Sequence, residues 1–189
     1  MVAIVSIEDD IVNGWRPRAF AAIDFETANR SGSSACALAA VRVEKRRISK
    51  RMVSLIRPPS SHFEFSHIHG ITWADVATEP VFREIWKRLA PAIEGAEFIA
   101  AHNATFDQNV LATCCRRSQI PIPDYPFVCT VSLARLKWGL HPTKLPDVCR
   151  FLALPLDHHD PLSDATACAR IVLAATAVGR PQGQEQLLP

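Results

Sequence analysis

The chain has 189 residues, of which 48% are hydrophobic and 21% charged, and its formal net charge at pH 7 is +2. This length and composition predict one globular domain with a sizeable core, and they exclude a disordered or fibrous protein. The small net charge is not enough to indicate a nucleic-acid partner. Any such partner must therefore be argued from a specific site.

The six cysteines form no CxxC pair, and most of them lie inside apolar segments, where a free cysteine behaves as a small hydrophobic residue. No apolar run approaches the length that a membrane span needs, and residues 1–10 reach acidic side chains too early for a signal peptide. We therefore expect a cytoplasmic protein with reduced cysteines and no membrane association.

Residues 1–17 carry the weakest pattern of the chain. Residues 2–7 are apolar enough for a strand, but acidic residues and Asn13-Gly14 follow directly. We treat 1–17 as an N-terminal extension of uncertain order. The next segments predict a strand at 20–24 and a hairpin of two strands at 35–43 and 48–56.

Basic residues cluster near the tip of the predicted hairpin. The favoured interpretation is a solvated hairpin tip, and a phosphate-steering surface is the alternative. The residues concerned are Arg42, Lys45, Arg46, Arg47, Lys50 and Arg51.

A long loop from Pro58 to Thr78 is rich in histidine and aromatic residues. Such a loop either packs its own rings as a lid on the core or offers Phe63 and Ile71 as surfaces for nucleic-acid bases, and the two interpretations are compatible.

The rest of the chain alternates helical and extended patterns. Together with the hairpin this order predicts an α/β fold, with a mixed β-sheet flanked by α-helices. The expected helices are 79–93, 104–118, 131–138, 145–152 and 161–178, the expected strands are 97–101 and 127–130, and 179–189 is expected to be a flexible tail.

The stretch from Ala21 to Thr27 is predicted to be a buried strand that ends with two carboxylates, Asp24 and Glu26. Side chains alternate across a strand, so these two acids project from one face while Ile23 and Phe25 point into the core. Two adjacent carboxylates repel each other and lose solvation unless a cation neutralises them. The alternative is a strand edge with two solvated acids.

Two further acidic residues and a histidine stand at element ends. Asp107 lies in the first turn of the helix that follows strand 97–101, and Asp164 lies one turn inside the last helix, whose N-cap is Asp160. His159 precedes that helix. Each residue alone has a simpler explanation, such as a favourable interaction with the helix dipole or, for His158 and His159, exposure in a loop. Their order along the chain favours a common site.

The sequence resembles the DEDDh 3′–5′ exonucleases, the superfamily of the proofreading epsilon subunit of bacterial replicative DNA polymerases. The resemblance covers residues 18–178 and implies an exonuclease domain there with a ribonuclease-H-like fold. It rests on Asp24-Phe25-Glu26-Thr27, on His102-Asn103-Ala104-Thr105-Phe106-Asp107, on the spacing from His159 to Asp164, and on the segments 67–72 and 144–149.

The resemblance implies two divalent ions, Mg²⁺ or Mn²⁺, held by Asp24, Glu26, Asp107 and Asp164. Carboxylates suit these ions, and two of them roughly 3.5–4 Å apart can stabilise both oxygens of a displacement at phosphorus. His159 is implied to be the general base, for which the ordinary pKa of histidine is suitable. The residues implied to shape the pocket of the terminal nucleotide are Thr27, Phe25, Asn103 and Phe106, with Ile71 as a wedge beside the last base.

The predicted function is metal-dependent 3′–5′ exonuclease activity on the 3′ ends of single-stranded nucleic acid, with DNA favoured over RNA and nucleoside 5′-monophosphates as products. Three alternatives remain open: a proofreading subunit bound to a DNA polymerase, a non-catalytic nucleic-acid-binding module of the same fold, and a two-metal enzyme with another phosphodiester or nucleotide substrate.

Overall fold

The structure is a computed structural model and describes residues 6–177. At its centre is a five-stranded sheet with the strand order β3-β2-β1-β4-β5. β1, β2 and β3 pair antiparallel, whereas β4 runs parallel to β1 and β5 parallel to β4. The predicted hairpin and the mixed sheet are therefore confirmed. The strands are β1 Ala19–Thr27, β2 Ala35–Glu44, β3 Arg47–Leu55, β4 Ile99–Ala101 and β5 Phe127–Cys129.

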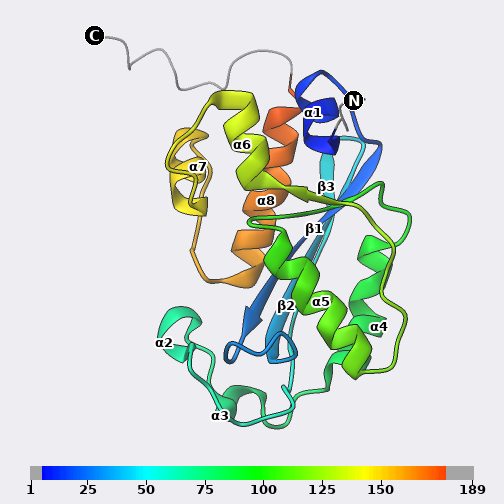
Figure 1. Ribbon diagram of the computed structural model, residues 1–189, viewed down its shortest axis with the longest axis vertical. Coiled ribbons are helices and arrows are strands. Elements are labelled where there is room, and N and C mark those ends of the chain that lie inside the picture. The colour runs from blue at the N-terminus through cyan, green and yellow to red at the C-terminus, as the bar shows by residue number, and fades with distance from the viewer. Residues whose placement is uncertain (1–5, 178–189) are drawn as a thin grey trace, which may run out of the picture.

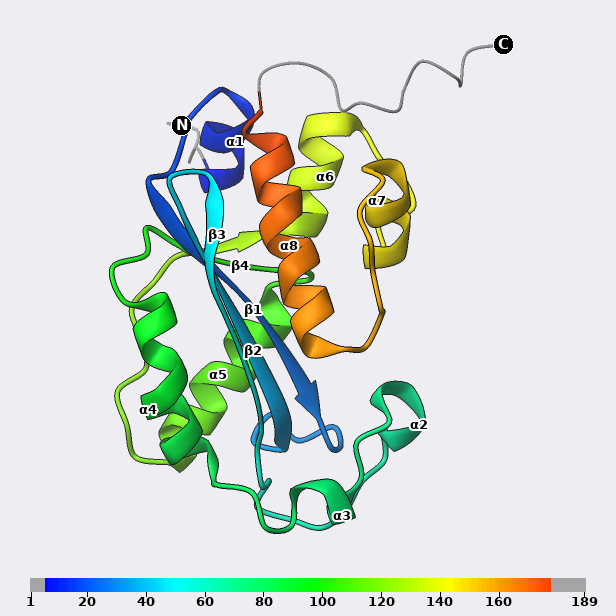
Figure 2. The ribbon, with the colours of Figure 1, turned by 180° about the vertical axis from the view of Figure 1, so that it is seen from behind.

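Helices cover both faces of the sheet (Figures 1 and 2). Ile23 and Phe25 of β1 belong to the core that is shared with α4 (Phe82–Ile93) and α5 (Thr105–Arg117). Phe20 and Ala22, on the opposite face, belong to the core that is shared with α6 (Thr130–Trp138) and α8 (Pro161–Ala175). Since side chains alternate along a strand, Asp24 and Glu26 lie on the α8 side. α7 (Leu145–Phe151) packs against α6 and α8.

Within the N-terminal extension, whose order the sequence left uncertain, residues 7–12 form a helix, α1 (Ile7–Val12), and residues 1–5 lie outside the described part. Ser6 and Asp9 form a reciprocal capping box at its N-terminus. Ile11 is fully buried in the core on the α8 side. Residues 6–12 are therefore a packed element of the fold.

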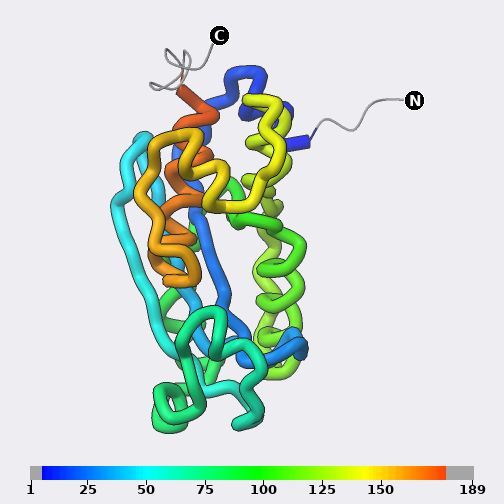
Figure 3. Tube along the Cα trace, turned by 90° about the vertical axis from the view of Figure 1, so that its left-hand side faces the viewer, coloured from blue at the N-terminus to red at the C-terminus, as the bar shows by residue number. Residues whose placement is uncertain are grey.

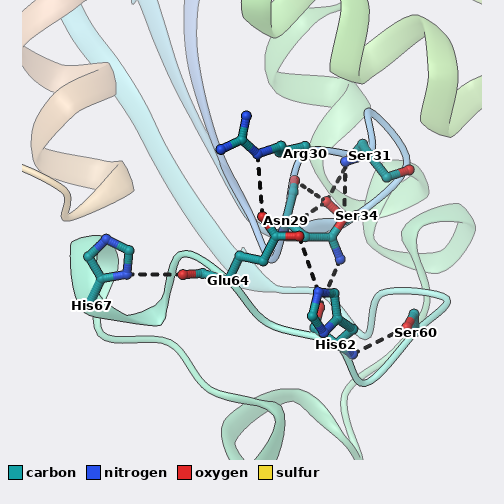
Figure 4. Close-up of polar contacts among 8 residues, drawn as sticks. All are labelled: Asn29, Arg30, Ser31, Ser34, Ser60, His62, Glu64 and His67. Atoms are coloured by element: carbon teal, nitrogen blue, oxygen red, sulfur yellow. Dashed lines mark hydrogen bonds and ion pairs between the residues drawn. The ribbon is translucent and has the colours of Figure 1, made fainter.

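The segment between β3 and α4 carries two one-turn helices, α2 (Ser66–His69) and α3 (Trp73–Val76), at one end of the molecule (Figure 3). Figure 4 shows how it is tied to the turn after β1: Asn29 Nδ2 donates to the carbonyl oxygen of His62 at 2.8 Å, and Arg30 pairs with Glu64 at 3.5 Å. Val76 is fully buried in a small satellite core against which Phe63 and Ile71 pack. The packed-lid interpretation is confirmed.

Two cations near the hairpin tip bind the ends of helices. Arg42 Nη1 donates to the carbonyl oxygen of Glu94 at 2.9 Å, at the C-terminus of α4. Arg46 Nη1 donates to Thr176 Oγ1 at 3.1 Å, at the C-terminus of α8. Both positions favour a cation, because the last carbonyl groups of a helix carry partial negative charge. The hairpin tip is therefore only partly solvated, because these two arginines bind the C-termini of α4 and α8.

The remaining expectations differ from the structure mainly at element ends. The helix expected at 79–93 begins later in the structure: Val81 is the N-cap of α4 and is 38% exposed. The six cysteines are free, and five of them are buried. Within residues 6–177 there is no helix of the length and apolarity that crossing a membrane requires. The expected tail at 179–189 lies outside the described residues.

Candidate active site

A cavity of about 630 Å³ opens where β1, α6 and the start of α8 meet. Asp24, Glu26, His159 and Asp164 line it, so the structure brings together four of the five predicted catalytic residues. The fifth, Asp107, lies behind this surface and is 2% exposed.

Asp107 joins the site through the backbone of β1. Its Oδ1 accepts a hydrogen bond of 3.1 Å from the backbone N–H of Phe25, the residue between the two acids of the strand. The first turn of α5 is thereby fixed to the strand that carries Asp24 and Glu26.

The start of α8 positions the other acid. Asp160 is the N-cap, and its Oδ1 accepts from the backbone N–H of Ser163 at 2.6 Å, as the sequence predicted. Asp164 then falls on the buried face one turn into the helix, where Ala165 and Cys168 are fully buried against the sheet. Small side chains at these positions let the helix approach β1 closely.

The carboxyl groups of the site are held in an environment that disfavours their charge. Burial, followed by the neighbouring charges of Asp107 and Asp164, raises the pKa of Asp24 well above its usual range. Burial and the charge of Asp164 raise the pKa of Glu26 to about 7. Burial also raises the pKa of Asp107 and of Asp164. Simultaneous ionisation of these four carboxyl groups is therefore energetically unfavourable when no cation is bound.

The chain supplies little positive charge to offset this repulsion. Among residues 6–177 no lysine or arginine forms an ion pair with the four acids, and the only ion pair is that of His158 with Asp164. Asp164 Oδ1 is buried and has no hydrogen-bond partner in the described part of the chain. An oxygen-rich, under-compensated site of this kind fits a hard divalent cation such as Mg²⁺ or Mn²⁺.

Two adjacent histidines stand over the acids. Their rings are stacked, with centroids 3.8 Å apart. His159 lines the cavity as its spacing predicted, has a left-handed backbone with φ of 74°, and has a pKa lowered by burial and by its neighbour. His158 Nδ1 donates to Asp164 Oδ2 at 2.9 Å, a contact that the sequence analysis did not anticipate.

The predicted substrate-binding residues fall into different places. Phe25 and Asn103 line the cavity, although Phe25 is only 3% exposed. Ile71 lines a neighbouring cavity of about 360 Å³ together with His159. Thr27 is 6% exposed and Phe106 43% exposed, and neither is among the residues that line the main cavity.

The cavity also contains residues that sequence reasoning did not assign to the site. Arg135 of α6 and Lys144, the N-cap of α7, bring positive charge to its wall. Arg135 Nε donates to Thr143 Oγ1 at 3.1 Å, which orders this wall. His102 lines the cavity as well, and its pKa is lowered to about 4, mainly by burial. Of these residues, Lys144 could have been assigned from the sequence, because it lies in the segment 144–149 on which the resemblance partly rests.

A family model described as Exonuclease (RNase_T) matches residues 21–172. The chain belongs to this exonuclease family. It is 35% identical to Exodeoxyribonuclease 10 of Escherichia coli K12 over 120 residues, which cover 61% of this chain and 47% of that protein. It is 33% identical to a DNA polymerase III subunit epsilon-like protein of Rhodobacter capsulatus over 129 residues, covering 64% of this chain and 18% of that protein. The matched part spans about half the length of Exodeoxyribonuclease 10, and less of the epsilon-like protein.

Solved structures share the fold of this exonuclease-family chain. Exonuclease X in complex with 5′ overhanging duplex DNA matches with a TM-score of 0.67 and 27% identity, over 86% of this chain and 95% of that one. The nuclease domain of 3′hExo, a DEDDh family member bound to rAMP, matches with a TM-score of 0.72 over 83% and 90% of the two chains; at 17% identity it supports the fold alone. The predicted DEDDh resemblance and ribonuclease-H-like fold are confirmed. Exonucleases of this family generally use divalent metal ions.

Proposed function

We propose that this chain is a metal-dependent 3′–5′ exonuclease that removes nucleotides one at a time from the 3′ end of single-stranded nucleic acid and releases nucleoside 5′-monophosphates. The observation that carries the proposal is the convergence of Asp24, Glu26, Asp107 and Asp164 around one cavity, with their pKa values raised and no lysine or arginine paired to them in residues 6–177. A cavity of about 630 Å³ also has room for a nucleotide.

The four acids are the residues that would hold two divalent ions, Mg²⁺ or Mn²⁺. When bound, such ions stabilise negative charge on the attacking and leaving oxygens of a displacement at phosphorus. Within residues 6–177, Asp164 Oδ1 is buried without a hydrogen-bond partner, which supports a cation at this atom.

His159 is proposed as the general base that takes the proton of the attacking water. Its place at the cavity wall and its lowered pKa favour a neutral imidazole that can accept a proton at neutral pH. Arg135 and Lys144, on the same wall, would bind phosphate oxygens of the substrate. Asn103 and Phe25 would contact the terminal nucleotide, with Ile71, which lines the adjoining cavity, as a wedge beside the last base.

DNA is the favoured substrate, because the similar proteins include an exodeoxyribonuclease and an exonuclease whose structure holds duplex DNA with a 5′ overhang. RNA is the second candidate, because the choice depends on how the site treats a 2′-hydroxyl, which the motifs do not record. Similarity to an epsilon-like subunit favours one further proposal, that the chain works beside a DNA polymerase in proofreading. The proposed location of the protein is the cytoplasm.

The decisive experiment compares single-stranded DNA and RNA of one sequence, each labelled at the 3′ or the 5′ end, with Mg²⁺, with Mn²⁺ and with chelator. The wild-type protein is expected to release the 3′ label at once as a mononucleotide and to produce a shortening ladder from the 5′-labelled strand. His159→Ala should lose this activity. His62→Ala, at an exposed histidine outside the cavity, should keep it.

Absence of metal-dependent shortening on both polymers would contradict the proposal. Binding of single-stranded nucleic acid without cleavage would instead favour a non-catalytic module, and cleavage of small phosphodiesters alone would favour a different substrate class. The DNA-to-RNA ratio of the rates decides the substrate. Co-purification of the chain with a polymerase tests the proofreading role.

A further inference from the structure

The two oxygens of Asp164 have unequal environments. Oδ2 accepts two hydrogen bonds, one of 2.9 Å from His158 Nδ1 and one of 3.2 Å from the backbone N–H of His159. Oδ1 is buried and accepts no hydrogen bond from any of the residues that the structure describes. The carboxylate is therefore held by one oxygen, and the other is left with an unsatisfied acceptor inside the site.

His158 is the one side chain in residues 6–177 that hydrogen-bonds to Asp164. The histidine side chain is 37% exposed and the aspartate side chain 5% exposed, so the contact closes the solvent side of the carboxylate. The left-handed backbone of His159 supports this arrangement, because its N–H meets the same oxygen while its ring stacks on that of His158.

We propose that His158 is a positioning residue of the active site: by binding Asp164 Oδ2 it fixes the rotation of this carboxylate and leaves Oδ1 free for a divalent cation. This inference rests on the proposed function. Groups that hydrogen-bond to a metal-ligating carboxylate orient it, and their removal typically costs about 10–100-fold in metal affinity. Because the aspartate side chain is 5% exposed, the contact also contributes to folding stability, and metal affinity is the property that separates positioning of the carboxylate from a purely structural role.

The contact can be separated from the ring stacking by two complementary substitutions. His158→Asn places an amide Nδ2 near the position of the imidazole Nδ1 and so keeps a donor while losing the ring. His158→Phe keeps a ring that can stack on His159 and loses the donor. His158→Ala removes both, and His62→Ala removes an exposed histidine that pairs only with Glu64.

The test is the dissociation constant of Mn²⁺, measured by electron paramagnetic resonance of free Mn²⁺ at fixed pH, with no nucleic acid present. Circular dichroism melts confirm that each variant is folded. We expect His158→Ala and His158→Phe to bind Mn²⁺ about 10–100-fold more weakly than wild type. His158→Asn and His62→Ala should stay within about threefold of wild type, a difference well below that range.

Each other outcome overturns the inference. Unchanged or tighter binding in His158→Ala means that His158 does not assist the cation, or competes with it. Weak binding in His158→Asn means that the imidazole matters for something other than its donor. If the wild-type protein binds no Mn²⁺ at all, the proposed function fails as well, whereas metal binding that is insensitive to residue 158 removes only the positioning role.

Discussion

The cost of the uncompensated acids can be measured in the metal-free protein through Glu26→Gln. Burial and Asp164 raise the pKa of Glu26 from its ordinary value of 4.5 to about 7, so the folded state prefers the neutral carboxyl group. A shift of one pKa unit corresponds to about 1.4 kcal/mol. The rise in the pKa of Glu26 therefore sets an upper limit of about 3 kcal/mol on the free energy that its ionisation costs the folded protein. Since the side chain is partly exposed, solvent screening reduces this, and we expect about 1–3 kcal/mol.

Glu26→Gln should therefore raise the free energy of unfolding at pH 8 in the presence of chelator, while it abolishes metal-dependent cleavage. The sign depends on pH in a defined way. The wild-type penalty is complete above pH 7 and absent below pH 4.5, where Glu26 is protonated in both the folded and the unfolded state. The advantage of the variant should shrink as the pH falls through this interval.

The assay is urea unfolding of both proteins at several pH values between 4.5 and 8, with chelator throughout. Glu84→Gln, at an exposed position of α4, is the matched control and should change the unfolding free energy by less than about 0.5 kcal/mol. A Glu26→Gln protein that is no more stable than wild type at pH 8, or whose advantage is the same at pH 4.5, would refute the reasoning that the site is electrostatically frustrated without a cation.

Three further predictions concern residues that stabilise the fold around the site. Asp160→Ala removes the N-cap of α8 and should lower the unfolding free energy by about 1 kcal/mol in urea; an unchanged value would mean that the cap is dispensable. Ile11→Ala should cost about 2–5 kcal/mol, because Ile11 is fully buried; a cost below about 1 kcal/mol would mean that α1 packs loosely. Burial lowers the pKa of His102 from 6.5 to about 4, so its contribution to stability is lost as the pH falls through this interval. Unfolding curves should show His102→Gln losing less stability over this range than wild type, by up to about 3 kcal/mol, and parallel pH profiles would contradict this.

Much of the site followed from local patterns in the sequence. The alternation along β1 placed Asp24 and Glu26 on one face and Ile23 and Phe25 in the core, because strand geometry leaves no other arrangement. The cap at Asp160 was equally legible, since an acidic residue before proline is a strong start signal for a helix.

The features that the sequence did not reveal depend on tertiary contacts or on weak local signals. The bond from His158 to Asp164 occurs beside a left-handed backbone at His159, a non-glycine residue at which local sequence does not predict this conformation. Arg135 lies on an exposed face of α6, and only the approach of the segment before α7 turns that face into a cavity wall. α1 was missed although the spacing from Ser6 to Asp9 is that of a capping box.

α1 bears on whether the protein self-associates through the edges of its sheet. β5 is an edge strand of three residues, and Glu8 Oε1 of α1 accepts a hydrogen bond of 2.8 Å from the backbone N–H of Cys129 in this strand. At the opposite edge, β3 presents exposed Arg47, Lys50 and Arg51. Unprotected edges are templates for pairing with another chain, and charge or a covering helix prevents this. A shortened protein that begins at residue 18 would therefore expose the short edge and should self-associate at concentrations where the full chain stays monodisperse.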